Sequence, residues 1–227
     1  MKNSLLFSIV IPTFNRANFL SIAINSIQKQ SYSNWEVLII DDGSTDNTKE
    51  IVSVKSKKDN RIKYFFQKNQ ERSVARNNGI KIASGDFICF LDSDDYYLEN
   101  HLEKINFYIL KNIKKSFFFT DFQFSSNQKI NSTHTNQYLK NSSIISYSLL
   151  NPIATGRAII RKDLLVKNNF NTSIRIGEDI ELWSRIATDQ NAFHIPINSY
   201  IQVEHNKRSI RVGQSITQIE HINTLNI

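Results

Sequence analysis

The chain of 227 residues has a single cysteine, Cys89, so no disulfide framework can form within it. Cys89 lies inside an apolar run, where a free cysteine packs as a small hydrophobic residue. No apolar stretch approaches the roughly 20 residues that a membrane-spanning helix needs. The apolar run near the start is short and is interrupted by Pro12, which is not typical of a signal peptide. We therefore expect a cytoplasmic protein.

Glycine is scarce, and its spacing excludes two common nucleotide-binding motifs. The six glycines never stand at G-x-G spacing, and no G-K-[ST] sequence occurs. A dinucleotide fingerprint and a phosphate-binding P-loop are thus both excluded. The five histidines are accompanied by no cysteine pair, so a structural zinc site is not expected either.

Basic residues outnumber acidic ones, 28 to 21, giving a formal net charge of +7. They cluster at residues 55–58, 111–115 and 207–211. Such clusters can be solvated helix faces, or they can attract phosphorylated ligands, an anionic membrane surface or nucleic acid. The charge alone does not distinguish these partners.

The first half of the chain alternates apolar runs with segments of helical periodicity. The runs predict four buried strands, at Leu5–Ile11, Glu36–Ile40, Ile62–Phe66 and Phe87–Leu91. The intervening segments predict helices around residues 20–27, around residues 51–52 and over Ser73–Ala83. This rhythm is typical of an α/β fold with a mostly parallel central sheet and helices on both faces. We expect one domain covering residues 1–227.

Acidic residues follow two of the predicted strands. Phe87–Leu91 ends in Asp92, Asp94 and Asp95, three carboxylates that repel one another unless a cation lies among them. Ligands of open α/β sheets bind at this carboxyl end of the strands. We expect Asp92 and Asp94 to hold a metal-bound diphosphate. Asp41 and Asp42 end the second strand, where the alternative is a turn with Thr45 or Asp46 capping a helix.

The second half is less regular. A helix from Leu98 leads to an apolar strand at Phe117–Phe119, and Thr120–Ser143 is polar enough to be a loop, either an acceptor-facing flap or a solvated connection. Glu178 and Asp179 open an amphipathic helix, where the helix dipole by itself favours acids.

Five motifs together resemble family 2 glycosyltransferases. They are Ser8–Arg16 (SIVIPTFNR), Asp41–Asp46 (DDGSTD), Ala75–Asn77 (ARN), Leu91–Asp95 (LDSDD) and Gly177–Asp179 (GED). Their order and approximate spacing match that family from Ser8 to about His205. The resemblance implies a GT-A fold, a nucleotide-sugar donor with UDP as the default nucleotide, a divalent cation such as Mn²⁺ or Mg²⁺, and inversion at the anomeric carbon.

The resemblance also implies roles for residues on the donor side, residues 1–97. Pro12, Thr13 and Asn15 match the loop beside the nucleoside. Asp42 matches the acid that accepts a hydrogen bond from the base, and Asp41 shapes the turn. Arg76 matches an arginine near base and phosphates, for which Arg72 is a nearby substitute. Asp92 and Ser93 match the positions near the ribose or the waters of the metal, Asp94 matches a direct metal ligand, and Asp95 is either part of this group, a helix cap or a solvent-facing acid.

On the acceptor side, residues 98–227, the resemblance implies that Asp179 is the catalytic base, with Glu178 as the alternative. It also implies that His205 contacts the metal or diphosphate, with Lys207, Arg208 or Arg211 closing over the phosphates; a solvated basic loop is the alternative. The acceptor would be a glycan or a lipid-linked sugar. The sugar and the oligomeric state stay open.

Two other functions are compatible with parts of the sequence. A nucleotidyltransferase would also use acids and a metal, but it usually carries a glycine-rich basic loop where this chain has Pro12–Asn15. A nucleic-acid-binding module is suggested only by basicity, and its recognition motifs are missing, so we expect no nucleic-acid partner.

Overall fold

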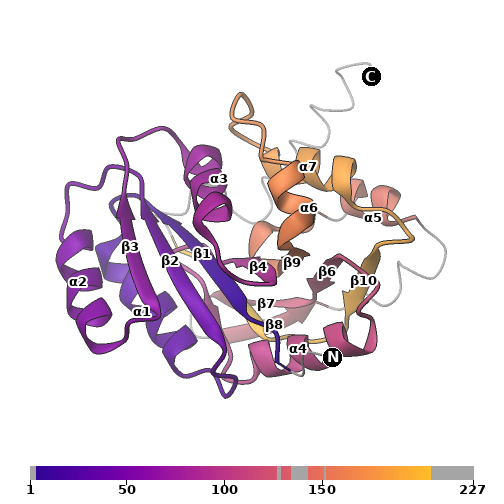
Figure 1. Ribbon diagram of the computed structural model, residues 1–227, viewed down its shortest axis with the longest axis horizontal. Helices are drawn as coiled ribbons and strands as arrows, with labels where there is room; N and C mark the ends of the chain where they lie inside the picture. The colour runs from indigo at the N-terminus through magenta and orange to yellow at the C-terminus, as the bar shows by residue number, and fades with distance from the viewer. Residues whose placement is uncertain (1–3, 127–128, 134–142, 151, 206–227) are drawn as a thin grey trace.

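The computed structural model describes residues 4–126, 129–133, 143–150 and 152–205. Its centre is a seven-stranded sheet with the strand order β10-β6-β9-β4-β1-β2-β3 (Figure 1). These strands are β1 (Phe7–Thr13), β2 (Trp35–Asp41), β3 (Ile62–Phe66), β4 (Phe87–Phe90), β6 (Phe117–Thr120), β9 (Ala158–Arg161) and β10 (Ala192–Ile195). The pairings are parallel except where β9 runs antiparallel between β4 and β6. The predicted α/β class and mostly parallel sheet are confirmed.

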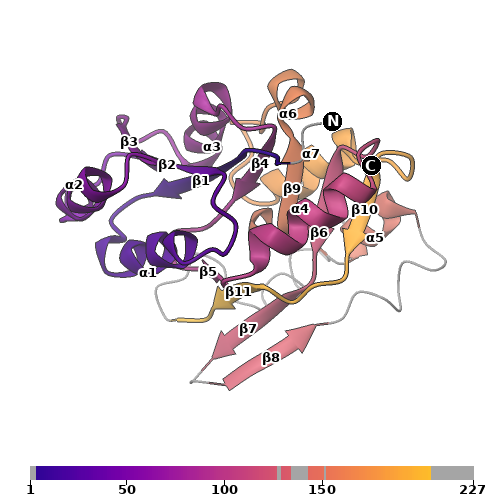
Figure 2. The ribbon, with the colours of Figure 1, turned by 60° about the horizontal axis from the view of Figure 1, so that its bottom comes forward.

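Helices cover both faces of this sheet, and each face has its own apolar cluster. The helices are α1 (Ala17–Gln28), α2 (Thr48–Lys58), α3 (Arg72–Ile82), α4 (His101–Lys111), α5 (Ile144–Leu150), α6 (Lys162–Lys167) and α7 (Glu178–Ile186), with a 3₁₀ turn η1 at Thr155–Arg157. Ile9 of β1 packs with residues of α1, α2 and α4, whereas the adjacent Val10 packs with residues of α3, α6 and α7 (Figures 1 and 2). Successive residues of a strand point to opposite faces, so one apolar run serves both clusters.

A smaller second sheet has the order β5-β11-β7-β8. Its strands are β5 (Tyr96–Tyr97), β11 (Tyr200–Val203), β7 (Phe122–Ser126) and β8 (Lys129–Thr133), and Figure 2 shows β7 and β8 as an extended hairpin beside β11. The expectation of a loop over Thr120–Ser143 is therefore wrong for the part that forms β7 and β8. Backbone pairing with the neighbouring strands stabilises these polar residues as strands without an apolar run.

Within the described ranges, none of the helices combines the length and apolar character that a membrane crossing requires. Trp183 is fully buried in α7 and donates its indole N–H to the carbonyl of Ile153 at 2.6 Å. The aromatic ring thus belongs to the packing between α7 and the sheet.

Candidate active site

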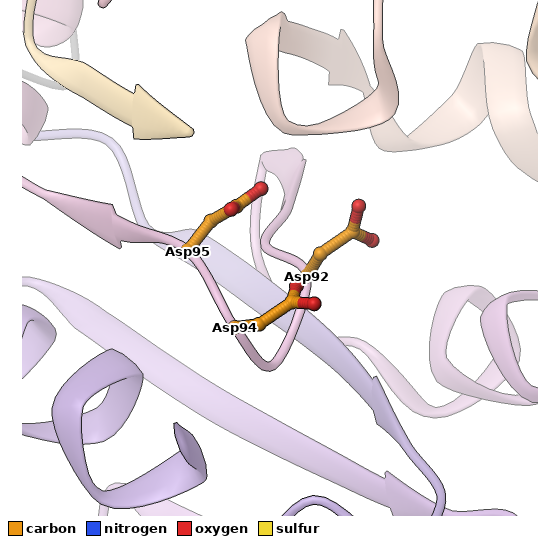
Figure 3. A group of neighbouring side chains, drawn as sticks. All are labelled: Asp92, Asp94 and Asp95. Atoms are coloured by element: carbon orange, nitrogen blue, oxygen red, sulfur yellow. The ribbon is translucent and has the colours of Figure 1, made fainter. Parts of the chain in front are cut away.

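The acidic loop after β4 brings three carboxylates together. Ligand oxygens of Asp92, Asp94 and Asp95 all lie within 4.8 Å of one another (Figure 3). The three carboxylates lie at the carboxyl end of β4. The strand Phe87–Phe90 is enclosed between both apolar clusters, and the polar residues begin where the strand ends. Ser93, between the first two, is also buried.

Asp95 is the most deeply buried of the three acids, and its partners lie far along the chain. Its carboxylate accepts a hydrogen bond from the Tyr200 hydroxyl and another, at 2.9 Å, from the backbone N–H of Val203. Asp95 is fully buried. The expectation of a helix cap or a solvent-facing acid is therefore wrong: this residue fastens the acidic loop to β11.

Asp94 lies beside His205 in the folded chain. Oδ2 of Asp94 is 3.0 Å from Nε2 of His205, and both side chains are largely buried. The imidazole also stacks on Phe19 of α1, with ring centroids 4.4 Å apart. Lys207, Arg208 and Arg211 lie outside the described residues.

Arg76 of α3 joins the acidic loop to the start of α7. Its Nη2 donates to Oδ1 of Asp92 at 3.2 Å, and its Nη1 donates to Oε1 of Glu178 at 2.8 Å. Nη2 also lies 3.2 Å from the hydroxyl of Thr155. Burial disfavours the charge on the guanidinium, but Asp92 and Glu178 outweigh it and raise the pKa of Arg76. Arg72 takes a secondary place, with its Nε 3.9 Å from Glu178.

Asp179 follows Glu178 in the first turn of α7, after Gly177 enters the helix with a φ of +80°. Its Oδ1 accepts the N–H of Ile180 at 2.9 Å. Burial and, next, the charge of Glu178 raise the pKa of Asp179 to about 6, although Arg76 and the backbone bonds oppose this rise. A carboxylate with this pKa is ionised at neutral pH and is a stronger base than an ordinary aspartate.

The ends of β1 and β2 form a second group of predicted residues. Asp42 accepts hydrogen bonds from the side chain of Gln67 at 2.7 Å and the backbone N–H of Gln70 at 2.8 Å, and its own N–H donates to the carbonyl of Thr13 at 2.8 Å. The hydroxyl of Thr13 is buried and has no hydrogen-bond partner in the described structure. Pro12, one residue earlier in β1, lies opposite Ile40 of β2.

Asn15 and Asp41 hold the loops of this second group. Asn15 adopts a left-handed φ of +50°, and its side-chain oxygen accepts the N–H of Thr45 at 2.8 Å. Asp41 is bonded to the N–H of Ser44 and to the hydroxyl of Tyr64. The structure thus connects Asn15 and Asp41 to the turn after β2, whereas Asp42 has one carboxylate oxygen for which no bond is described.

The two groups are neighbours, because β1 lies between β2 and β4 in the sheet. Oxygen and imidazole donors at Asp92, Asp94 and His205 are groups that Mg²⁺ or Mn²⁺ accepts, so the residues present fit a divalent cation. The hydrogen bonds from Tyr200 and Val203 to Asp95 hold the acidic loop that carries Asp92 and Asp94 against β11.

Several residues of the site escaped the sequence reasoning. Phe19, Thr155 and Tyr200 lie far in sequence from the site residues they contact: Tyr200 is 105 residues from Asp95, and Thr155 is 79 residues from Arg76. Their types carry no signal of function, so only the folded chain reveals them.

The family model of glycosyl transferase family 2 matches residues 8–166. The chain belongs to this family. An uncharacterized glycosyltransferase of Rickettsia felis is 40% identical over 190 residues, covering 80% of this chain and 30% of that protein. The chain therefore spans less than a third of the length of that relative.

A second relative is the UDP-Glc:α-D-GlcNAc-diphosphoundecaprenol β-1,3-glucosyltransferase WfgD of Escherichia coli. It is 35% identical over 187 residues, which cover 82% of this chain and 71% of that protein. Among solved structures, S. aureus TarS in complex with UDP-GlcNAc matches with a TM-score of 0.74 at 20% identity, covering 96% of this chain and 65% of that one. The mannosyltransferase PcManGT of Pyrobaculum calidifontis, in complex with GDP-Man and Mn²⁺, matches with a TM-score of 0.69 at 16% identity, covering 99% and 65%. These likenesses confirm the GT-A fold.

Proposed function

We propose that the protein transfers a sugar from a nucleoside-diphosphate donor, UDP-glucose or a close analogue, to a hydroxyl of a lipid-linked glycan. The observation that carries this proposal is the Arg76 network, which connects Asp92 of the acidic loop to Glu178 beside Asp179. Arg76 thereby joins the acidic loop, which would bind the donor, to the start of α7, which would bind the acceptor. The named activity of WfgD supports the choice of donor and acceptor.

The donor would lie along the ends of β1, β2 and β4. Asp42 offers its remaining carboxylate oxygen to the base, with Thr13 and Asn15 beside the nucleoside, and Asp92 and Ser93 beside the ribose. Asp94 and His205 would hold Mn²⁺ or Mg²⁺. Such a cation, when bound, offsets the negative charge of the departing nucleoside diphosphate.

Asp179 would take the proton from the acceptor hydroxyl as its oxygen attacks the anomeric carbon. The new carbon–oxygen bond forms on the face opposite the diphosphate, the bond to the diphosphate oxygen breaks, and the configuration inverts. Glu178 is paired with Arg76 at 2.8 Å, whereas burial raises the pKa of Asp179 to about 6. The geometry thus favours Asp179 over Glu178 as the base.

The experiment is a turnover assay with UDP-glucose, UDP-GlcNAc and GDP-mannose, each offered with α-D-GlcNAc-diphosphoundecaprenol and a divalent cation. We expect release of UDP and a lipid-linked disaccharide with a new β linkage, with little product from GDP-mannose. Binding of the nucleotides without any transfer to this or another glycan acceptor would contradict the proposal. A product with retained α configuration would overturn the inverting mechanism.

The family match favours this activity over a nucleotidyltransferase or a nucleic-acid-binding module. No contact in the described structure supports either alternative. The nucleotide-sugar donor and the glycan acceptor therefore remain the proposed partners.

A further inference from the structure

A second buried arginine lies outside the Arg76 network. Arg157 ends η1 and is only 3% exposed. Its Nε donates to the carbonyl of Thr120 at 2.8 Å, and its Nη1 donates to the carbonyl of Pro152 at 3.3 Å. Its Nη2 is buried with no hydrogen-bond partner, and no ion pair joins Arg157 to an acid among the described residues.

Thr120 contributes a second buried donor. The residue ends β6, and its hydroxyl also has no partner in the part of the chain that the structure describes. Phe118 of β6 and Ile159 of β9 pack in the same apolar cluster, and Thr120 and Arg157 each lie two residues from them. Because side chains alternate along a strand, Thr120 faces the side of that cluster, and Arg157 reaches the carbonyl of Thr120 from the adjoining turn η1.

A buried guanidinium without a carboxylate is a costly arrangement. A desolvated charge is normally balanced by an opposite charge, and an unsatisfied buried donor costs free energy by itself. Among the described residues, the contacts that balance the positive charge are the carbonyl dipoles of Thr120 and Pro152 and the ring of Phe122, 4.8 Å from Cζ. An oxyanion would satisfy both Nη2 and the threonine hydroxyl, and a planar guanidinium is well suited to phosphate.

The position of this pair relates it to the candidate active site. Thr155, at the other end of η1, contacts Arg76, and the intervening Gly156 lies against the ring of Tyr200, which holds Asp95. Arg157 therefore lies beside the acidic loop. It is on the side of β9 and β6, whereas Asp42 and the end of β2 lie on the opposite side of β4.

We infer that Arg157 and Thr120 form a phosphate-binding position for the acceptor. This assignment rests on the proposed function, under which the acceptor sugar is attached to a diphosphate. Arg157 supplies the charge through Nη2, and Thr120 donates its hydroxyl to the same oxyanion. The rest of the diphosphate and its lipid would extend away from the donor.

The binding test uses inorganic phosphate as the probe, followed by ³¹P line broadening on the full chain in EDTA, with and without saturating UDP. We expect Arg157→Met to weaken phosphate binding by about ten-fold or more, as loss of a charge-assisted bond requires. Thr120→Val, which keeps the side-chain shape, should weaken binding to a smaller extent. Arg161→Met, which removes an exposed arginine paired with Asp163 at 2.7 Å, is the matched control and should leave binding unchanged.

Saturating UDP should not displace phosphate from the wild-type protein. Displacement by UDP, or equal phosphate binding by wild type and both site variants, would overturn the inference and indicate the donor site or an adventitious ion only. If Arg157→Met fails to fold, Thr120→Val decides the result.

The acceptor assignment is tested by turnover. Arg157→Met should raise KM for GlcNAc-diphosphoundecaprenol about ten-fold and leave KM for an octyl glycoside of the same sugar unchanged. An equal rise for both acceptors would contradict the assignment. If wild type transfers to neither acceptor, the proposed function fails, while the phosphate-binding result stands separately.

Discussion

Arg76 is the residue on which the electrostatics of the site depend. It is buried, and it compensates Glu178, which is also buried, and Asp92, whose side chain is 31% exposed. Replacing Arg76 by an uncharged side chain leaves the two carboxylates without their positive partner in a poorly hydrated site. The cost is larger than the net stabilisation that the intact pair provides.

We predict that Arg76→Met lowers the free energy of unfolding by about 3–5 kcal/mol, because Glu178 loses its partner. The double variant Arg76→Met/Glu178→Gln should recover part of this loss. Urea denaturation at pH 7.5 measures both. If the loss of stability in the double variant equals the sum of the losses in the two single variants, Arg76 and Glu178 stabilise the fold independently.

The raised pKa of Asp179 predicts the pH dependence of the reaction. If the ionised carboxylate is the base, kcat/KM falls about ten-fold per pH unit below pH 6 and reaches a plateau above it. A pH–rate profile with saturating cation checks this. A plateau that extends unchanged to pH 4.5 would exclude a base with this pKa.

At the scale of elements, α3 brings Arg76 to the sheet through a close contact with β1. A Cβ on Gly79 would lie 2.4 Å from Cγ1 of Val10, which is fully buried. The absence of a side chain at Gly79 therefore sets the distance between helix and sheet. Glycine is not needed here for a positive φ, since Gly79 lies inside the helix.

Gly79→Ala should destabilise the protein by about 1–3 kcal/mol through overpacking and lower kcat by displacing Arg76. Val10→Ala makes room for the new methyl group, so the double variant should be more stable than the sum of the two single effects implies. Thermal denaturation and initial rates of the three variants measure this coupling. Additive effects would show that the helix does not shift.

Strands with a long apolar run could be predicted from the sequence, and short or polar strands could not. The strands β1, β2, β3 and β4 coincide with the predicted runs to within about two residues. The hairpin β7–β8 and the short β5 and β11 are polar or brief, and they exist because they pair with one another. Pairing partners distant in sequence leave no local pattern.

The same limit applies to the site. Acids at strand ends predicted the location of the acidic loop, because parallel strands end at one edge. The burial of Asp95 could not be predicted, since Tyr200 and Val203 lie more than 100 residues away. The roles of Asp42, Asp94 and Asp179 remain predictions that the geometry supports.

For the whole molecule, the net charge of +7 bears on how the protein would approach the proposed lipid-linked acceptor. Lys57 and Lys58 of α2 are exposed, as are Lys111 of α4 and Lys114 just beyond it. Juxtamembrane lysines each favour an anionic surface by about 1 kcal/mol, and salt screens this attraction. We propose peripheral contact with anionic lipid.

Co-sedimentation with vesicles of phosphatidylglycerol should capture the protein at about 0.05 M salt and release it at about 0.5 M. Vesicles of phosphatidylcholine are the control, and Lys111→Gln/Lys114→Gln tests one of the basic groups. Capture that does not depend on lipid charge or on salt would contradict the electrostatic contact.

We propose that strand-end acids bind the donor while Asp179 activates the acceptor. The most direct test compares UDP-glucose binding and turnover in Asp179→Asn with the exposed control Asp163→Asn. We predict that Asp179→Asn binds the donor like wild type but transfers sugar at least about 10²-fold more slowly, while the control changes neither binding nor turnover. Normal turnover by Asp179→Asn would contradict the claim.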